Sequence, residues 1–123
     1  MNRPEQALQR GAIQYLRMLE NLGELVAFHC PFGGSRSRTE AAIFKGLGVR
    51  AGVPDIVIVL PIGRVDFIEL KAGAGQLSEN QKQFKKQIEA MGAPYAECRD
   101  LNQVENFVRE LIAAEPARFQ DVG

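Results

Sequence analysis

Several residue types are scarce in this chain. It has no tryptophan, one histidine and two cysteines, and its 15 basic residues balance 15 acidic ones. Two cysteines are too few for a disulfide scaffold, and with His29 they supply three soft ligands where a closed zinc site normally has about four. One histidine also leaves little basis for a nucleophile–histidine triad. Neither a structural zinc site nor a covalent nucleophile is therefore expected.

Long hydrophobic runs are missing as well. The longest run, residues 56–62, is the size of a strand and far shorter than the about 20 residues that cross a membrane. The first residues lead into an amphipathic pattern and not into the apolar region of a signal peptide. We therefore expect a cytoplasmic protein with no membrane partner.

The composition that remains is that of a globular domain. The 123 residues are 46% hydrophobic and 24% charged. This predicts one domain over residues 1–123, with a core over about 5–112 and a loose tail over 115–123. Because the net charge is zero, any nucleic-acid footprint has to be local. The segment 36–54 is locally basic, since it carries four cations and one acid.

Periodicity and turn residues predict an α/β fold with a central mixed β-sheet flanked by helices, in the order α-β-α-β-β-α-β-α. Capping patterns begin three of the helices, at Thr39, at Ser78 with Gln81, and at Asn102. The expected helices are 5–22, 39–46, 78–91 and 102–112, and the expected strands are 25–28, 56–60, 65–71 and 94–98.

The hairpin of strands 56–60 and 65–71 carries the informative charges. Side chains alternate along a strand, so Glu69 and Lys71 share one face. A three-residue turn ending in a left-handed Gly63 places Asp55 opposite Glu69, on that same face. A four-residue turn would send Asp55 to the other face. We expect the first register, or a bulge with the same result.

Two carboxylates this close repel each other, and a divalent cation removes that cost. Such a cation polarises a phosphoryl oxygen and activates water, while the Lys71 ammonium orients that water or stabilises charge on the phosphate. In the alternative interpretation, Asp55 caps a turn, and Glu69 with Lys71 is a solvated ion pair. The order of acid, strand, short turn, strand and Glu-x-Lys favours the metal site.

This pattern resembles the core motif of the PD-(D/E)XK nuclease superfamily, here Pro54-Asp55 and Glu69-Leu70-Lys71. Glu5 in the first helix, Gly52-Val53 before Pro54, and the segment 75–81 narrow the resemblance to the VRR-NUC branch (virus-type replication-repair nucleases). Small stand-alone phage and bacterial members are the most similar. The resemblance covers about residues 5–112.

The resemblance implies a restriction-endonuclease-like core and a DNA nuclease that depends on Mg²⁺ or Mn²⁺. Asp55 and Glu69 would bind the metal, with the Leu70 carbonyl as a further ligand, and Lys71 would be the catalytic lysine. Glu5 would match the acid of the first helix, and Gln81 the glutamine of the last motif. Both have simpler alternatives, because Glu5 suits a helix N-terminus and Gln81 suits a capping box.

The stand-alone members resemble Holliday-junction resolvases. The resemblance therefore implies a homodimer acting on branched or four-way DNA, in a bacterial or phage-infected cell, and two-fold symmetry supplies the two cuts that a junction needs. For DNA contacts, the local charge favours Arg36, Arg38 and Lys45, although these are also ordinary solvated residues. Two rival functions stay open: an exonuclease or nickase on the same scaffold, and a non-catalytic DNA-binding or assembly module.

Overall fold

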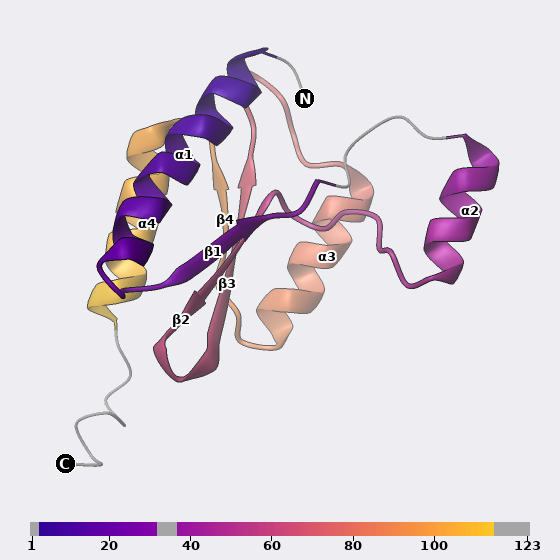
Figure 1. The fold of residues 1–123 in the computed structure, drawn as a ribbon. Helices are drawn as coiled ribbons and strands as arrows, with labels where there is room; N and C mark the ends of the chain where they lie inside the picture. The colour runs from indigo at the N-terminus through magenta and orange to yellow at the C-terminus, as the bar shows by residue number, and fades with distance from the viewer. Residues whose placement is uncertain (1–2, 32–36, 115–123) are drawn as a thin grey trace.

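Four strands form one mixed sheet with helices on both faces (Figure 1). The computed structural model describes residues 3–31 and 37–114. The predicted order and fold class are confirmed, and the boundaries differ from the expected ones by at most two residues. The helices are α1 (Arg3–Asn21), α2 (Arg38–Gly46), α3 (Glu79–Ala90) and α4 (Leu101–Ala113), and the strands are β1 (Val26–His29), β2 (Ile56–Leu60), β3 (Arg64–Leu70) and β4 (Tyr95–Cys98).

The strands lie in the order β1-β2-β3-β4, with β3 and β4 parallel and the other pairs antiparallel. A short 3-10 turn over Pro61–Gly63 connects β2 to β3 and pairs Leu60 with Arg64, as predicted. Gly63 has the expected positive φ of 75°, and Ile62 before it also has a positive φ of 61°. Continued past β2, this register puts Asp55 opposite Glu69.

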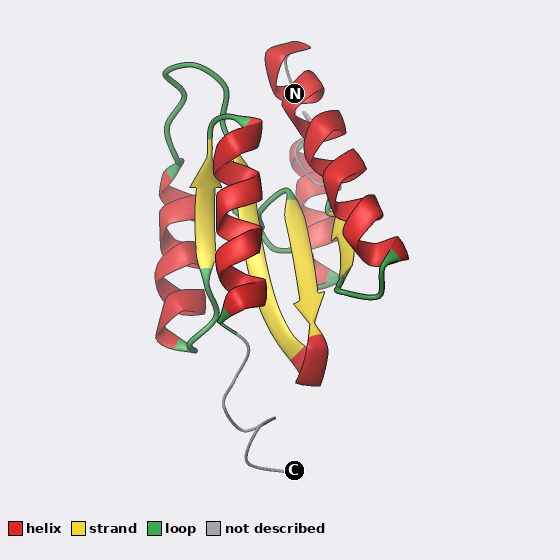
Figure 2. Cartoon of the chain, turned by 90° about the vertical axis from the view of Figure 1, so that its left-hand side faces the viewer, coloured by secondary structure: helices red, strands yellow, loops and turns green. Residues whose placement is uncertain are grey.

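One face of the sheet is covered by α1 and α4, which lie in front of the strands in Figure 2. Leu16 of α1 and Val108 of α4 are fully buried there against Ile58 and Ile68 of the central strands. The helices turn one apolar stripe each toward the sheet, as the spacing of their apolar residues requires. This layer is the main hydrophobic core.

The other face is only partly covered. Helix α3 packs Phe84 edge-to-face on Phe67, with ring centroids 5.6 Å apart, and Tyr95 joins this small cluster. Helix α2 stands apart from the sheet (Figure 1), and in the described part of the chain it buries none of its residues. This face is therefore covered by α3 alone among the helices that pack on it in the described residues.

Two helix starts differ from the prediction. Helix α2 is capped by Ser37, whose hydroxyl accepts from the Glu40 N–H, and not by Thr39. Helix α4 is capped by Asp100, whose carboxylate accepts from the Gln103 N–H, and not by Asn102. In both cases the side chain two residues earlier is the better-placed acceptor. It accepts a hydrogen bond from an N–H group of the first turn that has no partner within the helix.

The edge strand β1 is protected by α1. The Ala27 N–H donates to Glu20, and the Ala27 carbonyl accepts from Arg17, which also pairs with Glu20. These side chains occupy backbone groups that would otherwise template another strand. Among the described helices, none is both long and apolar enough to cross a bilayer.

Candidate active site

Asp55 lies directly before β2 and is fixed from two sides. Its carboxylate Oδ2 accepts from the Leu70 N–H at 2.8 Å. Its own carbonyl accepts from the Cys30 N–H at 2.8 Å and lies 2.7 Å from His29 Nδ1. The ends of β1 and β3 therefore both hold Asp55, which explains why a residue outside the strand keeps the strand register.

Glu69 is on β3 and faces α3, as alternation along the strand predicts. Although it is charged, only 4% of its surface is exposed. Its Oε2 accepts from Gln81 Nε2 at 3.1 Å and lies 3.6 Å from Lys71 Nζ. Lys71, two residues later on the same face, is itself largely buried. The structure therefore brings Glu69, Lys71 and Gln81 together.

Gln81 forms the expected capping box and also contacts Glu69, while its role in catalysis stays a prediction. It completes the capping box of α3, since its Oε1 accepts from the Ser78 N–H at 2.8 Å while its own N–H donates to the Ser78 hydroxyl. The other end of the same side-chain amide donates to Glu69. The start of α3 is thus the element that orients Glu69.

Burial raises the pKa of Glu69 well above its usual value, and the neighbouring Asp55 carboxylate raises it further. The Lys71 ammonium opposes this but does not offset it. A pair of carboxylates that resists double ionisation is the donor set that a hard divalent cation stabilises. The chemistry of this pair therefore fits Mg²⁺ or Mn²⁺.

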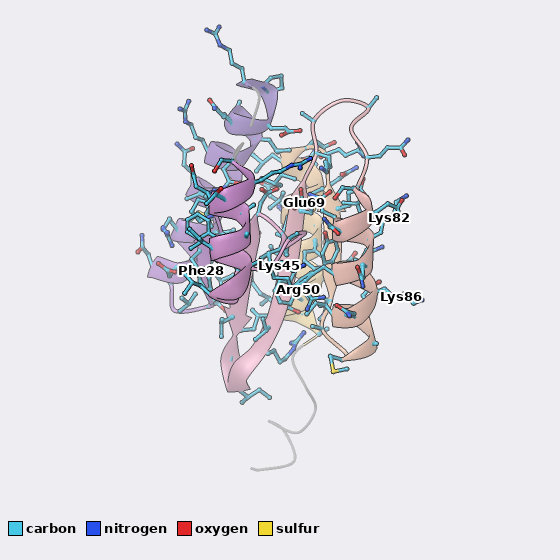
Figure 3. The ribbon with its side chains drawn as sticks, turned by 90° about the vertical axis from the view of Figure 1, so that its right-hand side faces the viewer. Phe28, Lys45, Arg50, Glu69, Lys82 and Lys86 are labelled. Carbon is cyan, nitrogen blue, oxygen red and sulfur yellow. The ribbon has the colours of Figure 1, made fainter. Side chains whose placement is uncertain are left out.

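A cavity of about 730 Å³ opens over the two carboxylates, between α2 and α3 (Figure 3). Asp55, Glu69 and Gln81 line this cavity. The cations Lys45 of α2 and Arg50 of the following loop also line it. Figure 3 shows Lys45, Arg50 and Glu69 in the gap between the two helices, whereas Lys82 and Lys86 lie on the outer side of α3.

The predicted DNA contacts are divided by this arrangement. Lys45 lines the cavity, and Arg38 is exposed at the first turn of α2. Arg36 lies outside the described residues. Arg50 also belongs to the locally basic segment 36–54, and no contact was predicted for it. In the structure its guanidinium lies 5.1 Å from the centroid of the Phe84 ring and donates to Gln87, so that α3 holds this cation beside the cavity.

The sequence predicted no role for two charged residues at the end of β4, Glu97 and Arg99. Glu97 is the register partner of Glu69 and pairs with Arg99. Arg99 also donates to the Gly73 carbonyl at 2.9 Å, which ties β4 to the loop that follows Lys71. The sequence carries no signal for these contacts, because nothing local fixes the register of two parallel strands joined through a helix.

Two predicted roles are not decided by the geometry. Glu5 lies in the first turn of α1. Over residues 3–31 and 37–114, no three His, Cys, Asp or Glu side chains are grouped as metal ligands, so the part of Glu5 in a metal site stays a prediction. Leu70 contributes its N–H to Asp55, and the use of its carbonyl as a ligand also stays a prediction.

Comparisons with known proteins identify the family and the fold of the chain. The VRR-NUC domain family model matches residues 8–100. The chain is similar to a solved VRR-NUC domain, with a TM-score of 0.61 and 19% identity over 86% of this chain and 95% of that one. It is also similar to a solved VRR-NUC domain protein, with a TM-score of 0.69 and 21% identity over 89% of this chain and 88% of that one.

No curated protein matches the chain. At these identities the solved structures establish the fold alone, whereas the family model spans most of the sequence and both candidate strands of the site. The fold is also consistent with the PD-(D/E)XK core that the sequence motif resembles. The chain therefore belongs to the VRR-NUC family of nucleases.

Proposed function

We propose that this protein is a divalent-metal-dependent DNA endonuclease that hydrolyses phosphodiester bonds. The observation that carries the proposal is the pair of Glu69, which is buried, and Asp55, which is partly buried; the pair lies beside Lys71 and lines a cavity that Lys45 and Arg50 also line.

Asp55 and Glu69 would hold Mg²⁺ or Mn²⁺. When bound, the ion supplies Lewis-acid activation of a water and of the phosphate. Gln81 holds one Glu69 oxygen by donating to it, and the Leu70 N–H holds one Asp55 oxygen. These bonds fix the two carboxylates before the ion arrives, which reduces the reorganisation that binding requires.

Lys71 is the group placed to act on the substrate. Its ammonium is 3.6 Å from Glu69 and is mostly shielded from solvent, so its charge is weakly screened. In this position it orients the attacking water or stabilises negative charge as it develops on the phosphate. Lys45 and Arg50, which also line the cavity, would bind the flanking phosphates of the strand to be cut.

Branched DNA as substrate and a homodimer as the active form belong to the same proposal. A junction needs two symmetric cuts, and a two-fold dimer supplies two sites. The unpacked α2 supports a dimer, since Ile43 and Leu47 are exposed on it, and Val26 and Phe28 are exposed on β1. Exposed apolar side chains of this kind are typical of a protein interface.

Cleavage assays on three substrates test this function. A four-way junction, a linear duplex and a single strand are each incubated with Mg²⁺, Mn²⁺ or EDTA. Paired nicks across the junction, lost with EDTA and lost in Asp55→Asn, are the expected result. Release of terminal nucleotides would indicate the exonuclease and a single cut the nickase. Binding without cleavage under any metal condition would indicate the non-catalytic module and refute the proposal.

Sedimentation equilibrium tests the dimer separately. We expect wild type to sediment as a dimer and Ile43→Glu with Leu47→Glu as a monomer, because the two charges would have to be buried in the interface. Met91→Glu is the matched control, since Met91 is also an exposed apolar residue but lies at the far end of α3. A monomeric wild type at micromolar concentration would rule out the dimer.

A further inference from the structure

Gly52 makes an unusually close approach to α3. Its φ is +84°, and a methyl group built on it would lie 2.3 Å from the Asn80 carbonyl oxygen and 2.8 Å from the Gln81 nitrogen. Both atoms are backbone, so no side chain can rotate away. The loop before Asp55 therefore rests directly on the first turn of α3, in a place that only glycine fits.

This contact closes a ring of interactions around the site. Gly52 touches the Asn80–Gln81 peptide, and the Gln81 side chain donates to Glu69. The next residue after Glu69, Leu70, donates its N–H to Asp55, which lies three residues after Gly52. The two carboxylates and the start of α3 are thus mutually constrained, and Gly52 sets how near the helix lies.

We propose that Gly52 is a positioning residue of the metal site, acting through Gln81. The absence of a side chain at position 52 lets the start of α3 lie close enough for Gln81 to hold Glu69 beside Asp55. This inference rests on the proposed function, because it assumes that the two carboxylates bind a divalent cation. A side chain at position 52 pushes the first turn of α3 outward and releases Glu69 from Gln81.

Gly48 provides a matched control. It lies in the same connection and also has a positive φ, +97°, but a methyl group built on it would meet nothing within 4 Å. Gly48→Ala therefore introduces the same kind of backbone strain as Gly52→Ala without the collision with α3. Any difference between the two variants reports the contact with the helix.

The test measures Mn²⁺ affinity by electron paramagnetic resonance of the free ion, without DNA. We expect Gly52→Ala to weaken binding by at least about tenfold, the usual scale for a lost outer-shell support, and Gly48→Ala to bind like wild type. In cleavage assays excess Mn²⁺ should restore the Gly52→Ala rate, while the KM for DNA stays unchanged. Equal affinity in the two variants would overturn the inference.

A double-mutant cycle tests the route through Gln81. In a Gln81→Ala background, Gly52→Ala should weaken Mn²⁺ binding little further, because the bond it would break is already gone. Fully additive losses would overturn the route. If circular dichroism shows that Gly52→Ala does not fold, Ser78→Ala disturbs the same helix start from the other side. Unchanged affinity in Ser78→Ala would then overturn the inference.

The same data separate this inference from the proposed function. If wild type binds no Mn²⁺, the proposed function itself fails. If wild type binds Mn²⁺ and cleaves DNA but Gly52→Ala and Gly48→Ala have equal Mn²⁺ affinity, the proposed function is supported and the positioning role of Gly52 is refuted.

Discussion

Two buried acids on β3 face opposite sides of the sheet. Asp66 points into the core under α1 and α4 and is fully buried, while Glu69 points toward α3 and is 4% exposed. Neither oxygen of Asp66 has a hydrogen-bond partner among the described residues. Glu69 has Gln81 and Lys71. The same strand therefore carries a buried carboxyl without partners and another held by polar groups.

Burial raises the pKa of both acids, to about 6 for Asp66, where Arg64 opposes the rise. Burial alone therefore does not distinguish a functional acid from a structural one. Their neighbours differ, because Glu69 has an amide, an ammonium and a second carboxylate beside a cavity, while Asp66 has Arg64 as its one charged neighbour in the described residues and lies on the face of the apolar core. The face under α1 and α4 holds the main apolar core, and the face toward α3 carries the proposed site.

The largest expected effect lies on the α3 face. Lys71→Ala should lower the cleavage rate by about 10²- to 10⁴-fold, the range for a lost acid–base or electrostatic group. The melting temperature should change little, since Lys71 contributes to no apolar cluster in the described residues. Lys82→Ala, on the exposed side of α3, is the control. Full activity of Lys71→Ala would remove Lys71 from the mechanism.

The opposite face should show the reverse pattern. Leu16→Ala removes a fully buried side chain and should cost about 2–5 kcal/mol of unfolding free energy in urea titrations. The fraction that stays folded should bind Mn²⁺ like wild type. Leu22→Ala, at an exposed leucine just beyond α1, should cost far less. A loss of Mn²⁺ affinity in Leu16→Ala would show that the two faces are coupled.

Asp66 should make stability depend on pH. Its pKa rises from 3.8 in the unfolded chain to about 6 in the folded protein, so the folded state binds the proton more tightly. Its contribution is therefore complete below pH about 4 and is lost as the pH rises through 6, by up to about 3 kcal/mol.

Asp66→Asn should remove this pH dependence and become more stable relative to wild type as the pH rises from 4 to 7. Thermal unfolding across that range measures the effect. Glu24→Gln, at an exposed acid, is the control and should leave the wild-type slope in place. If wild type and Asp66→Asn show parallel pH profiles, Asp66 is not the buried proton acceptor.

The smallest effect concerns DNA binding by the cations of the basic segment 36–54. Replacing Arg36, Arg38 and Lys45 by alanine should reduce the slope of log K against log salt by about one for each lost phosphate contact. Replacing Lys82, Lys85 and Lys86 on α3 removes the same charge from another surface and should change the slope less. Equal changes would mean that net charge, not the basic segment 36–54, governs binding.

Part of this structure could be predicted from the sequence, because short-range rules decide it. The three-residue turn at Pro61–Gly63 fixed the hairpin register, and alternation then placed Asp55, Glu69 and Lys71 on one side. The capping box of Ser78 and Gln81 followed from four residues of sequence. In each case the deciding forces act over a few residues, so local chemistry is sufficient.

Packing between distant segments decided the rest. The contact of Gly52 with α3, the Arg50–Phe84 stack and the pairing of Glu69 with Glu97 all join residues more than 20 positions apart. The burial of Asp66 under α1 and α4 and the separation of α2 from the sheet also depend on distant parts of the chain. These features depend on which layers pack together, a sum over the whole core that no short stretch of residues encodes.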